Sequence, residues 1–193
     1  MTTAHSETKG GVMGHVVRRF IHLGIILIPF VYYDWILPAF SIFHAHLLIL
    51  IIMFIVTMAE LIRLHCRFVF FAQRAYEATH FSSFAWTLLS SGVVLLFSPA
   101  QSFSIAILVS CALIDPLLGE LKPKLGKTIV LFLIGVVAVT FIWIMCALHN
   151  EIPLWLAFVM GPITIAAEWP TFRWIDDNAL MILVPLAVVV LVI

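Results

Sequence analysis

The residue with the strongest chemical signal is an aspartate at the end of a long apolar run. Asp115 closes the run that begins near Phe103, and Pro116 follows it directly. A carboxylate at membrane depth is costly and is by default a functional residue. Because proline lacks the N–H that continues a helix, we expect the helix to break at this pair and to lie beside a cavity. The alternative is a helix end whose aspartate reaches water.

After this aspartate, three lysines fall within a stretch of six residues, at Lys122, Lys124 and Lys127. Gly126-Lys127-Thr128 is similar to the end of a phosphate-binding P-loop. However, Leu121 stands where the first glycine of that motif belongs, so this is not a Walker A motif. The lysines predict a flexible basic loop that binds phosphates or anionic lipid headgroups.

Oxygen-bearing side chains gather before the last apolar run. Glu168 precedes Pro170, and Asp176-Asp177-Asn178 comes shortly afterwards. These are hard oxygen ligands that suit Mg²⁺, which keeps several waters and needs only one or two carboxylates. Asp-Asp-Asn is also a good helix N-cap, and the two roles do not exclude each other.

A basic stretch precedes the first apolar run. His22 stands four residues after Arg18 and three after Arg19, so a helix places the three side chains on one face. This spacing is typical of a phosphate-binding face, and also of a membrane anchor with one interfacial histidine.

The second apolar run ends in Glu60, Arg63 and Arg67. Offsets of three and seven place these side chains along one helical stripe. A functional site and an ion pair within the helix are equally compatible with that spacing.

Together these clusters contain the residue types that phosphoryl transfer needs. Carboxylates can hold Mg²⁺, cations can neutralise phosphates, and one carboxylate can orient or deprotonate an attacking hydroxyl. An apolar bundle would add a surface on which a lipid alcohol can lie with its hydroxyl at the interface.

The composition identifies the elements that must position these residues as membrane helices. Of 193 residues, 64% are hydrophobic and 10% charged, whereas soluble domains are near half apolar and a quarter charged. The ten basic residues balance the ten acidic ones, so nucleic acid is not an expected partner. Without the two-residue alternation of membrane strands, the chain is predicted to be an all-α helical bundle. We predict seven spans, at residues 20–38, 43–62, 84–99, 102–119, 128–148, 152–168 and 178–193.

The distribution of charge predicts the orientation. All ten Lys and Arg residues fall on one side of the predicted bundle, and the connections on the other side carry none. By the positive-inside rule the N-terminus is cytoplasmic and the C-terminus is outside. Eight of the ten acids share the cytoplasmic side, although orientation does not require them there. We expect residues 1–17 to form a polar cytoplasmic leader and residues 18–193 one membrane domain of a prokaryotic plasma membrane.

In their order and spacing, these clusters resemble a family of membrane lipid kinases. This is the family of dolichol kinase, phytol kinase and CTP-dependent diacylglycerol kinase, and the resemblance covers residues 18 to 186. The matching positions are Arg18-Arg19-Phe20-Ile21-His22, Glu60 with Arg63, Asp115-Pro116 with Gly119, Glu168, Asp177-Asn178 and Pro185-Leu186. The chain departs from the family after the Asp-Pro element, where Lys127-Thr128 continues into Ile129-Val130 without the usual Glu-Gly.

The resemblance implies transfer of the γ-phosphate of CTP or another nucleotide to a long-chain lipid alcohol. The alcohol would be a polyprenol, a phytol-like alcohol or diacylglycerol, and Mg²⁺ would be the cofactor. The resemblance implies catalytic roles for Asp115, Glu60 and His22. The residues it implies for phosphate binding are Arg18, Arg19, Arg63, Lys122, Lys124 and Lys127. The Mg²⁺ ligands it implies are Asp115, Glu168, Asp176, Asp177 and Asn178.

Two other classes of protein fit parts of the pattern. A small transporter would explain intramembrane polar residues, but would place them near the midplane rather than at one face. A catalytically inactive scaffold of the same fold would explain the missing Glu-Gly. A CDP-alcohol transferase should show Asp-Gly-x-x-Ala-Arg, and the sequence has no such run. The sequence leaves the oligomeric state open.

Overall fold

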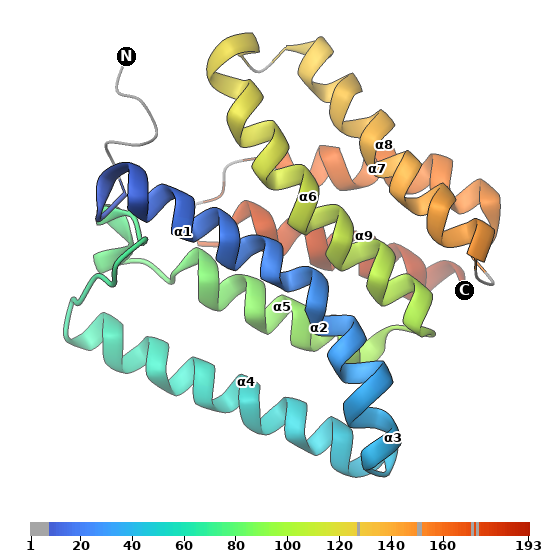
Figure 1. Cartoon of the computed structure of the whole chain (residues 1–193), viewed down its shortest axis with the longest axis horizontal. Coiled ribbons are helices and arrows are strands. Elements are labelled where there is room, and N and C mark those ends of the chain that lie inside the picture. Colours follow the sequence, from blue (N-terminus) through green and yellow to red (C-terminus); the bar gives the residue numbers. More distant parts are fainter. Residues whose placement is uncertain (1–7, 127, 150–151, 171, 173) are drawn as a thin grey trace.

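The secondary structure of the described chain is helical throughout, apart from one isolated bridge between Thr8 and Arg74 (Figure 1). The computed structural model describes residues 8–126, 128–149, 152–170, 172 and 174–193. The first rod, Gly11–Ala39, comprises α1 (Gly11–Leu23), η2 (Gly24–Ile26), α2 (Leu27–Phe30), the π-helical η3 (Val31–Ile36) and α3 (Leu37–Ala39). The remaining elements are α4 (Ile42–His65), η4 (Ala75–Ala78), α5 (Ser83–Phe97), α6 (Gln101–Leu125), α7 (Ile129–His149), α8 (Leu154–Glu168) and α9 (Asp177–Val192).

Each of the seven predicted apolar runs is a helix, with ends that mostly agree within a few residues. The first rod is an exception, because it begins at Gly11, inside the segment 1–17 that we expected to be a leader. Residues 1–7 lie outside the described residues.

Four of the helices are long and apolar enough to cross a membrane: the first rod, α4, α6 and α7. At 1.5 Å per residue, the 15 residues of α5 and of α8 rise about 22 Å and the 16 of α9 about 24 Å. These three are shorter than the bilayer core of about 30 Å. The chain is a helical membrane protein, and seven crossings remain a prediction.

The packed centre of the molecule is α6. It contacts α1, α2, α5, α7 and α9, and the core around it includes Ile107, Leu108, Ile114 and Leu118. Helices α7 and α8 pack closely where a Cβ on Gly161 would collide with Thr140. This half of the protein is a compact bundle that fixes the position of α6.

The first rod and α4 form a more open half (Figure 1). The rod lies on α6 whereas α4 lies on α5. At one end they are joined by a small apolar cluster that contains Tyr32, Ala45, Ile49 and Leu95. At the other end, residues 66–82 (the α4–α5 loop) pair with the start of the chain, because Lys9 N–H donates to Gln73 O at 2.8 Å. The two helices are thus held apart along their middle.

Three expectations about local structure are wrong. Pro116 does not break the helix at Asp115, since α6 continues to Leu125 with Pro116 and Pro123 inside it. Burial of Ile114 and Leu118 on either side of Pro116 gives these turns packing energy that outweighs one missing N–H donor.

The other two errors concern basic residues near helix ends. Lys122 and Lys124 lie in the last turn of α6 rather than in a flexible loop, while Lys127 lies outside the described residues. Arg67 does not continue the stripe of Glu60 and Arg63. The helix ends at His65, and Arg67 takes a left-handed backbone conformation with a φ of 50°.

Candidate functional site

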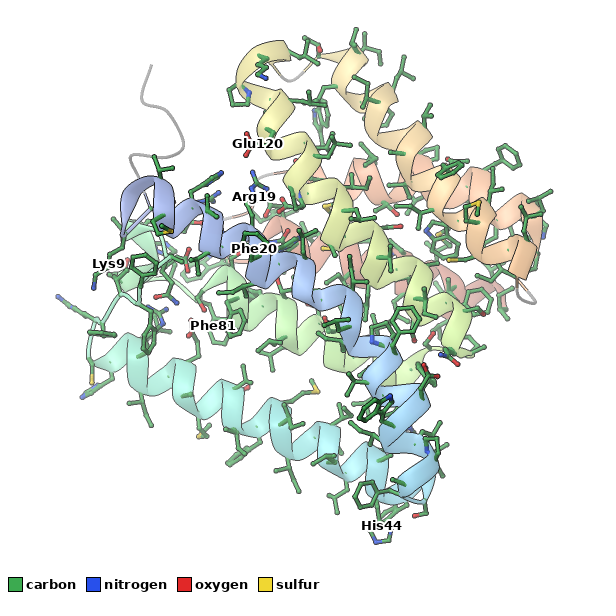
Figure 2. All side chains as sticks on the ribbon, in the orientation of Figure 1. Lys9, Arg19, Phe20, His44, Phe81 and Glu120 are labelled. Atoms are coloured by element: carbon green, nitrogen blue, oxygen red, sulfur yellow. The ribbon has the colours of Figure 1, made fainter. Side chains whose placement is uncertain are left out.

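Arg19 of α1 reaches across to α6 at one end of the bundle. Its guanidinium lies 3.2 Å from Glu120 Oε1 and 3.9 Å from Asp115 Oδ2. Figure 2 shows Arg19 and Glu120 facing each other between the two helices, with His44 at the far end of the molecule. A Cβ on Gly119 would lie 2.5 Å from Arg19 Nη2, so the glycine leaves the space that the guanidinium occupies.

His22 lies one turn further along α1 and contacts the same aspartate. Its Nε2 is 3.5 Å from Asp115 Oδ2 and 3.2 Å from the carbonyl oxygen of Cys111. A carbonyl oxygen can only accept, so Nε2 carries the proton and donates to Cys111, with the Asp115 carboxylate close by. We call Arg19, His22, Asp115 and Glu120 the α1–α6 cluster. It combines a half-buried carboxylate with two cationic or proton-donating neighbours.

A second group, the α9 cluster, forms where α5 and α9 begin. Ser83 Oγ donates to Asp176 Oδ1 at 3.0 Å and accepts a hydrogen bond from Asn178 Nδ2 at 2.9 Å. Asp176 is also the N-cap of α9, so the capping role is real. We include Asp177 in this cluster. Burial, together with the neighbouring Asp177 carboxylate, raises the pKa of Asp176 to about 7.

The two clusters adjoin each other. Cys111, one turn before Asp115 on α6, points its thiol at the carbonyl of Asn178 at 3.8 Å. The charge of Arg74, in the α4–α5 loop, interacts with carboxylates of both clusters. Burial alone would lower the pKa of Arg74, but a hydrogen bond with Tyr76 and the Asp177 and Asp115 carboxylates raise it. The loop therefore adds a cation whose charge interacts with these carboxylates.

Glu60 and Arg63 form a buried ion pair at the end of α4. Arg63 Nε and Nη2 donate to the two carboxylate oxygens of Glu60 at 2.9 and 2.8 Å. The other three N–H groups of the guanidinium donate to the carbonyls of Phe68, Glu77 and His80. Arg63 thus uses all five donors to hold the α4–α5 loop, and Glu60 also accepts the N–H of Ser82.

Arg18 belongs to the same structural region. Its Nη1 lies 3.0 Å from Oε1 of Glu77, a fully buried glutamate in η4. Glu77 also accepts the backbone N–H of Arg74, which completes the capping box of η4. Arg18 therefore ties α1 to the loop.

Of the three predicted phosphate-binding lysines, two are described. Lys122 pairs with Glu168 of α8 at 3.2 Å, and Glu168 is buried. Lys124 is exposed to solvent. This pair joins α6 to α8 next to the α1–α6 cluster.

The predicted Mg²⁺ ligands do not form a closed site. Among the described residues, no three His, Cys, Asp or Glu side chains are close enough to hold a metal ion together. However, Asn178 Oδ1 is buried and accepts no hydrogen bond from the described part of the chain. That oxygen, beside Asp176 and Asp177, fits an ion that takes most of its ligands from water and phosphate.

A cavity of about 690 Å³ opens beside both clusters. Arg18, His22, Glu60, Ser82 and Ser83 line its polar end. The rest of the lining is mostly apolar and comes from α1, η2, α2, α4, α5 and the α4–α5 loop. The volume lies in the range of ligand-binding pockets, about 300–1,000 Å³.

No protein-family model, curated protein or solved structure matches the chain.

Sequence reasoning missed three members of the site. Ser83 begins a helix without any recognisable motif, and it meets Asp176 across 93 residues of chain. Arg74 counted only as one of the basic residues on one side, and Glu77 stood out in no motif. A serine or glutamate beside an apolar run carries no signal until the partner that approaches it is known.

Proposed function

We propose that the protein is an integral membrane lipid kinase that transfers the γ-phosphate of a nucleotide, CTP by family resemblance, to the hydroxyl of a lipid alcohol. The observation that carries the proposal is the meeting of the α1–α6 and α9 clusters beside a cavity that is polar at one end and apolar at the other. The basic residues of the same face support a site that faces the cytoplasm, and the membrane we propose is a prokaryotic plasma membrane.

The residues divide between two tasks. Arg19, with Arg74 and Lys122, would neutralise phosphate oxygens, because arginine forks match phosphate geometry. His22 would hold Asp115 in position. Glu60 and Arg63 would act through the loop they hold in place rather than touch the substrate.

Mg²⁺ fits the α9 cluster, where Asp176, Asp177 and the free oxygen of Asn178 would hold it, with Glu168 nearby. When bound to the nucleotide phosphates, Mg²⁺ would offset the negative charge of the transferred group.

The transfer is a single displacement at phosphorus. The lipid hydroxyl oxygen forms a bond to the γ-phosphorus, and the bond from that phosphorus to the β–γ bridging oxygen breaks. The nucleoside diphosphate leaves with the electron pair. The hydroxyl proton goes to a carboxylate of the site, which we assign to Asp115.

The experiment is phosphate transfer by the purified protein in detergent. Labelled CTP or ATP would be supplied with Mg²⁺ and a polyprenol, phytol or diacylglycerol. We expect labelled lipid from the natural protein, and a loss of at least about 100-fold for Asp115→Asn, the effect of removing a catalytic acid or base. Asp34→Asn is the matched control, because Asp34 pairs with Gln101 at 3.1 Å at the opposite end.

The outcomes separate the hypotheses. A folded protein that labels no lipid from either nucleotide would overturn the kinase and favour a transporter or an inactive scaffold. Labelled lipid that persists in Asp115→Asn would keep the kinase but remove Asp115 as the proton acceptor.

A further inference from the structure

The cavity beside the site continues along the open half of the molecule. A second cavity of about 280 Å³ lies between the first rod, α4 and α5. Ile28, Val56 and Leu88 line both cavities, so the two meet at these side chains. We call the pair of cavities the α1–α4–α5 groove.

The polarity of the side chains that line the groove changes along its length. At the end near the site its lining includes Arg18, His22 and Ser83. Beyond Val56 the lining is almost entirely apolar and extends to Leu95 near the end of α5. Leu95 follows Ser83 by twelve residues, which corresponds to about 18 Å of helix, more than half of a bilayer core of about 30 Å.

The polar end offers a hydrogen-bonding position for a hydroxyl. A serine hydroxyl has one donor and two acceptor lone pairs. Ser83 donates to Asp176 and accepts from Asn178, which leaves one lone pair that can accept a further hydrogen bond. Ser83 is buried and lines the cavity, so that lone pair can accept a hydrogen bond from the hydroxyl of an apolar molecule while no nucleotide is bound. Phosphate transfer then requires the hydroxyl to turn its proton from Ser83 to the carboxylate.

We propose that the α1–α4–α5 groove binds a single-chain lipid alcohol, with its hydroxyl at Ser83 and its hydrocarbon chain directed past Val56 toward Leu95. This rests on the proposed function and narrows its substrate to one-chain alcohols such as isoprenoid or fatty alcohols. The apolar cavity beyond Val56 is the smaller of the two, about 280 Å³ against about 690 Å³. It joins the larger cavity at Ile28, Val56 and Leu88, which gives one continuous path for one hydrocarbon chain.

Blocking the meeting point of the two cavities tests the path of the chain. Val56→Trp would fill it from α4, and Leu88→Phe would fill it from α5 if the first variant fails to fold. Ile55→Trp is the matched control, because Ile55 is 58% exposed on the adjacent position of α4. Binding of short and long alcohols would be measured by native mass spectrometry without nucleotide, and phosphate transfer would be measured in parallel.

We expect Val56→Trp to weaken binding of phytol by at least about tenfold, since each methylene excluded from the groove loses apolar burial. Binding of geraniol, a shorter alcohol, should change little, and Ile55→Trp should bind both as the natural protein does. Equal losses for both alcohols, no loss for either, or diacylglycerol binding as tightly as phytol would overturn the proposal.

A second pair of variants tests the hydroxyl position. Ser83→Ala should weaken binding of phytol but not of the hydrocarbon phytane, which lacks the hydroxyl. Ser90→Ala is the control, because Ser90 is also buried on α5 and its Oγ bonds to none of the described residues. Equal weakening of phytol and phytane would contradict a contact with the hydroxyl.

The two readouts keep this inference distinct from the kinase proposal. Selective binding of phytol without phosphate transfer would overturn the kinase proposal and support the lipid-binding groove. Phosphate transfer that does not respond to Val56→Trp or Leu88→Phe would remove the groove and leave the kinase.

Discussion

Two groups of charged side chains flank the polar end of the cavity, and they are built from the same residue types. In the pair of Glu60 and Arg63, side-chain exposure is 7% and 3%, and protein atoms occupy every guanidinium donor. In the pair of Asp115 and Arg19, exposure is 26% and 23%, and the closest atoms are 3.9 Å apart. The hydrogen-bonding groups of the first pair are fully used within the protein, whereas the second pair can still bind another partner.

The difference teaches how to separate structural from functional charges in this protein. A buried charge with complete hydrogen bonding stabilises one loop conformation and cannot bind a phosphate without breaking it. A loosely paired, partly exposed carboxylate between cations loses little interaction energy when a ligand enters the site. We therefore propose that Glu60 and Arg63 belong to the framework, and that Arg19 and Asp115 take part in the chemistry.

The largest effect on stability should come from the pair of Glu60 and Arg63. Glu60→Gln would leave Arg63 buried beside a neutral partner, a type of change that costs about 3–5 kcal/mol. We expect a large fall in Tm, followed by the fluorescence of the six tryptophans in detergent. Glu120→Gln is the control, because the Glu120 side chain is 59% exposed and should change Tm little. A Glu60→Gln protein with unchanged Tm but no phosphate transfer would reverse our assignment of this pair.

A smaller effect, on activity rather than stability, should come from Gly119→Ala. The new Cβ would push away the guanidinium of Arg19, which can move because it is the end of a flexible side chain. We expect phosphate transfer to fall by about tenfold, near 1.4 kcal/mol of transition-state stabilisation, with an unchanged Tm. Leu117→Ala is the control, because Leu117 is 38% exposed on the same helix and lines neither cavity. Equal activity of both variants would show that the position of Arg19 is not critical.

A further effect, on the pH dependence of stability, should appear at Asp176. Its pKa rises from an ordinary 3.8 to about 7, so between these values the folded state binds more protons than the unfolded state. Stability therefore falls as the pH rises through this window. Asp176→Asn does not titrate and keeps a good N-cap. Its Tm relative to the natural protein should increase by a few degrees from pH 5 to pH 8.

This prediction is checked by measuring Tm for both proteins at several pH values without nucleotide or Mg²⁺. A constant difference between the two proteins across the range would show that Asp176 is ionised in the fold without cost.

The smallest effect should come from Lys124→Ala. Lys124 is exposed in the last turn of α6, whereas Lys122 pairs with buried Glu168. We expect Lys124→Ala to change phosphate transfer by less than about twofold, because exposed charges are screened. Lys122→Ala, tested beside it, should reduce transfer more. A larger loss in Lys124→Ala would return that lysine to the phosphate-binding group.

Prediction from sequence succeeded for the helices and failed at their ends. Apolar runs the length of a membrane helix have one stable backbone form in lipid, so their number and approximate bounds could be predicted. Pro116 was wrongly predicted to break a helix, because its local effect is opposed by the burial of Ile114 and Leu118. Arg67 was wrongly placed on the helical stripe of Glu60 and Arg63, because the turn after His65 depends on the loop that Arg63 holds.

The sequence by itself determined that the chain is a bundle of apolar helices and that its charges gather at their ends. Both follow from the cost of exposing backbone and charge to hydrocarbon, which acts on each residue locally. The spacing of Glu60 and Arg63 already allowed an ion pair within one helix, and the tertiary structure decided that this pair is buried. Only the tertiary structure brings Arg19 over Gly119 to Asp115 and joins Ser83 to Asp176. Those contacts depend on which helices pack together, and no spacing along the chain contains that information.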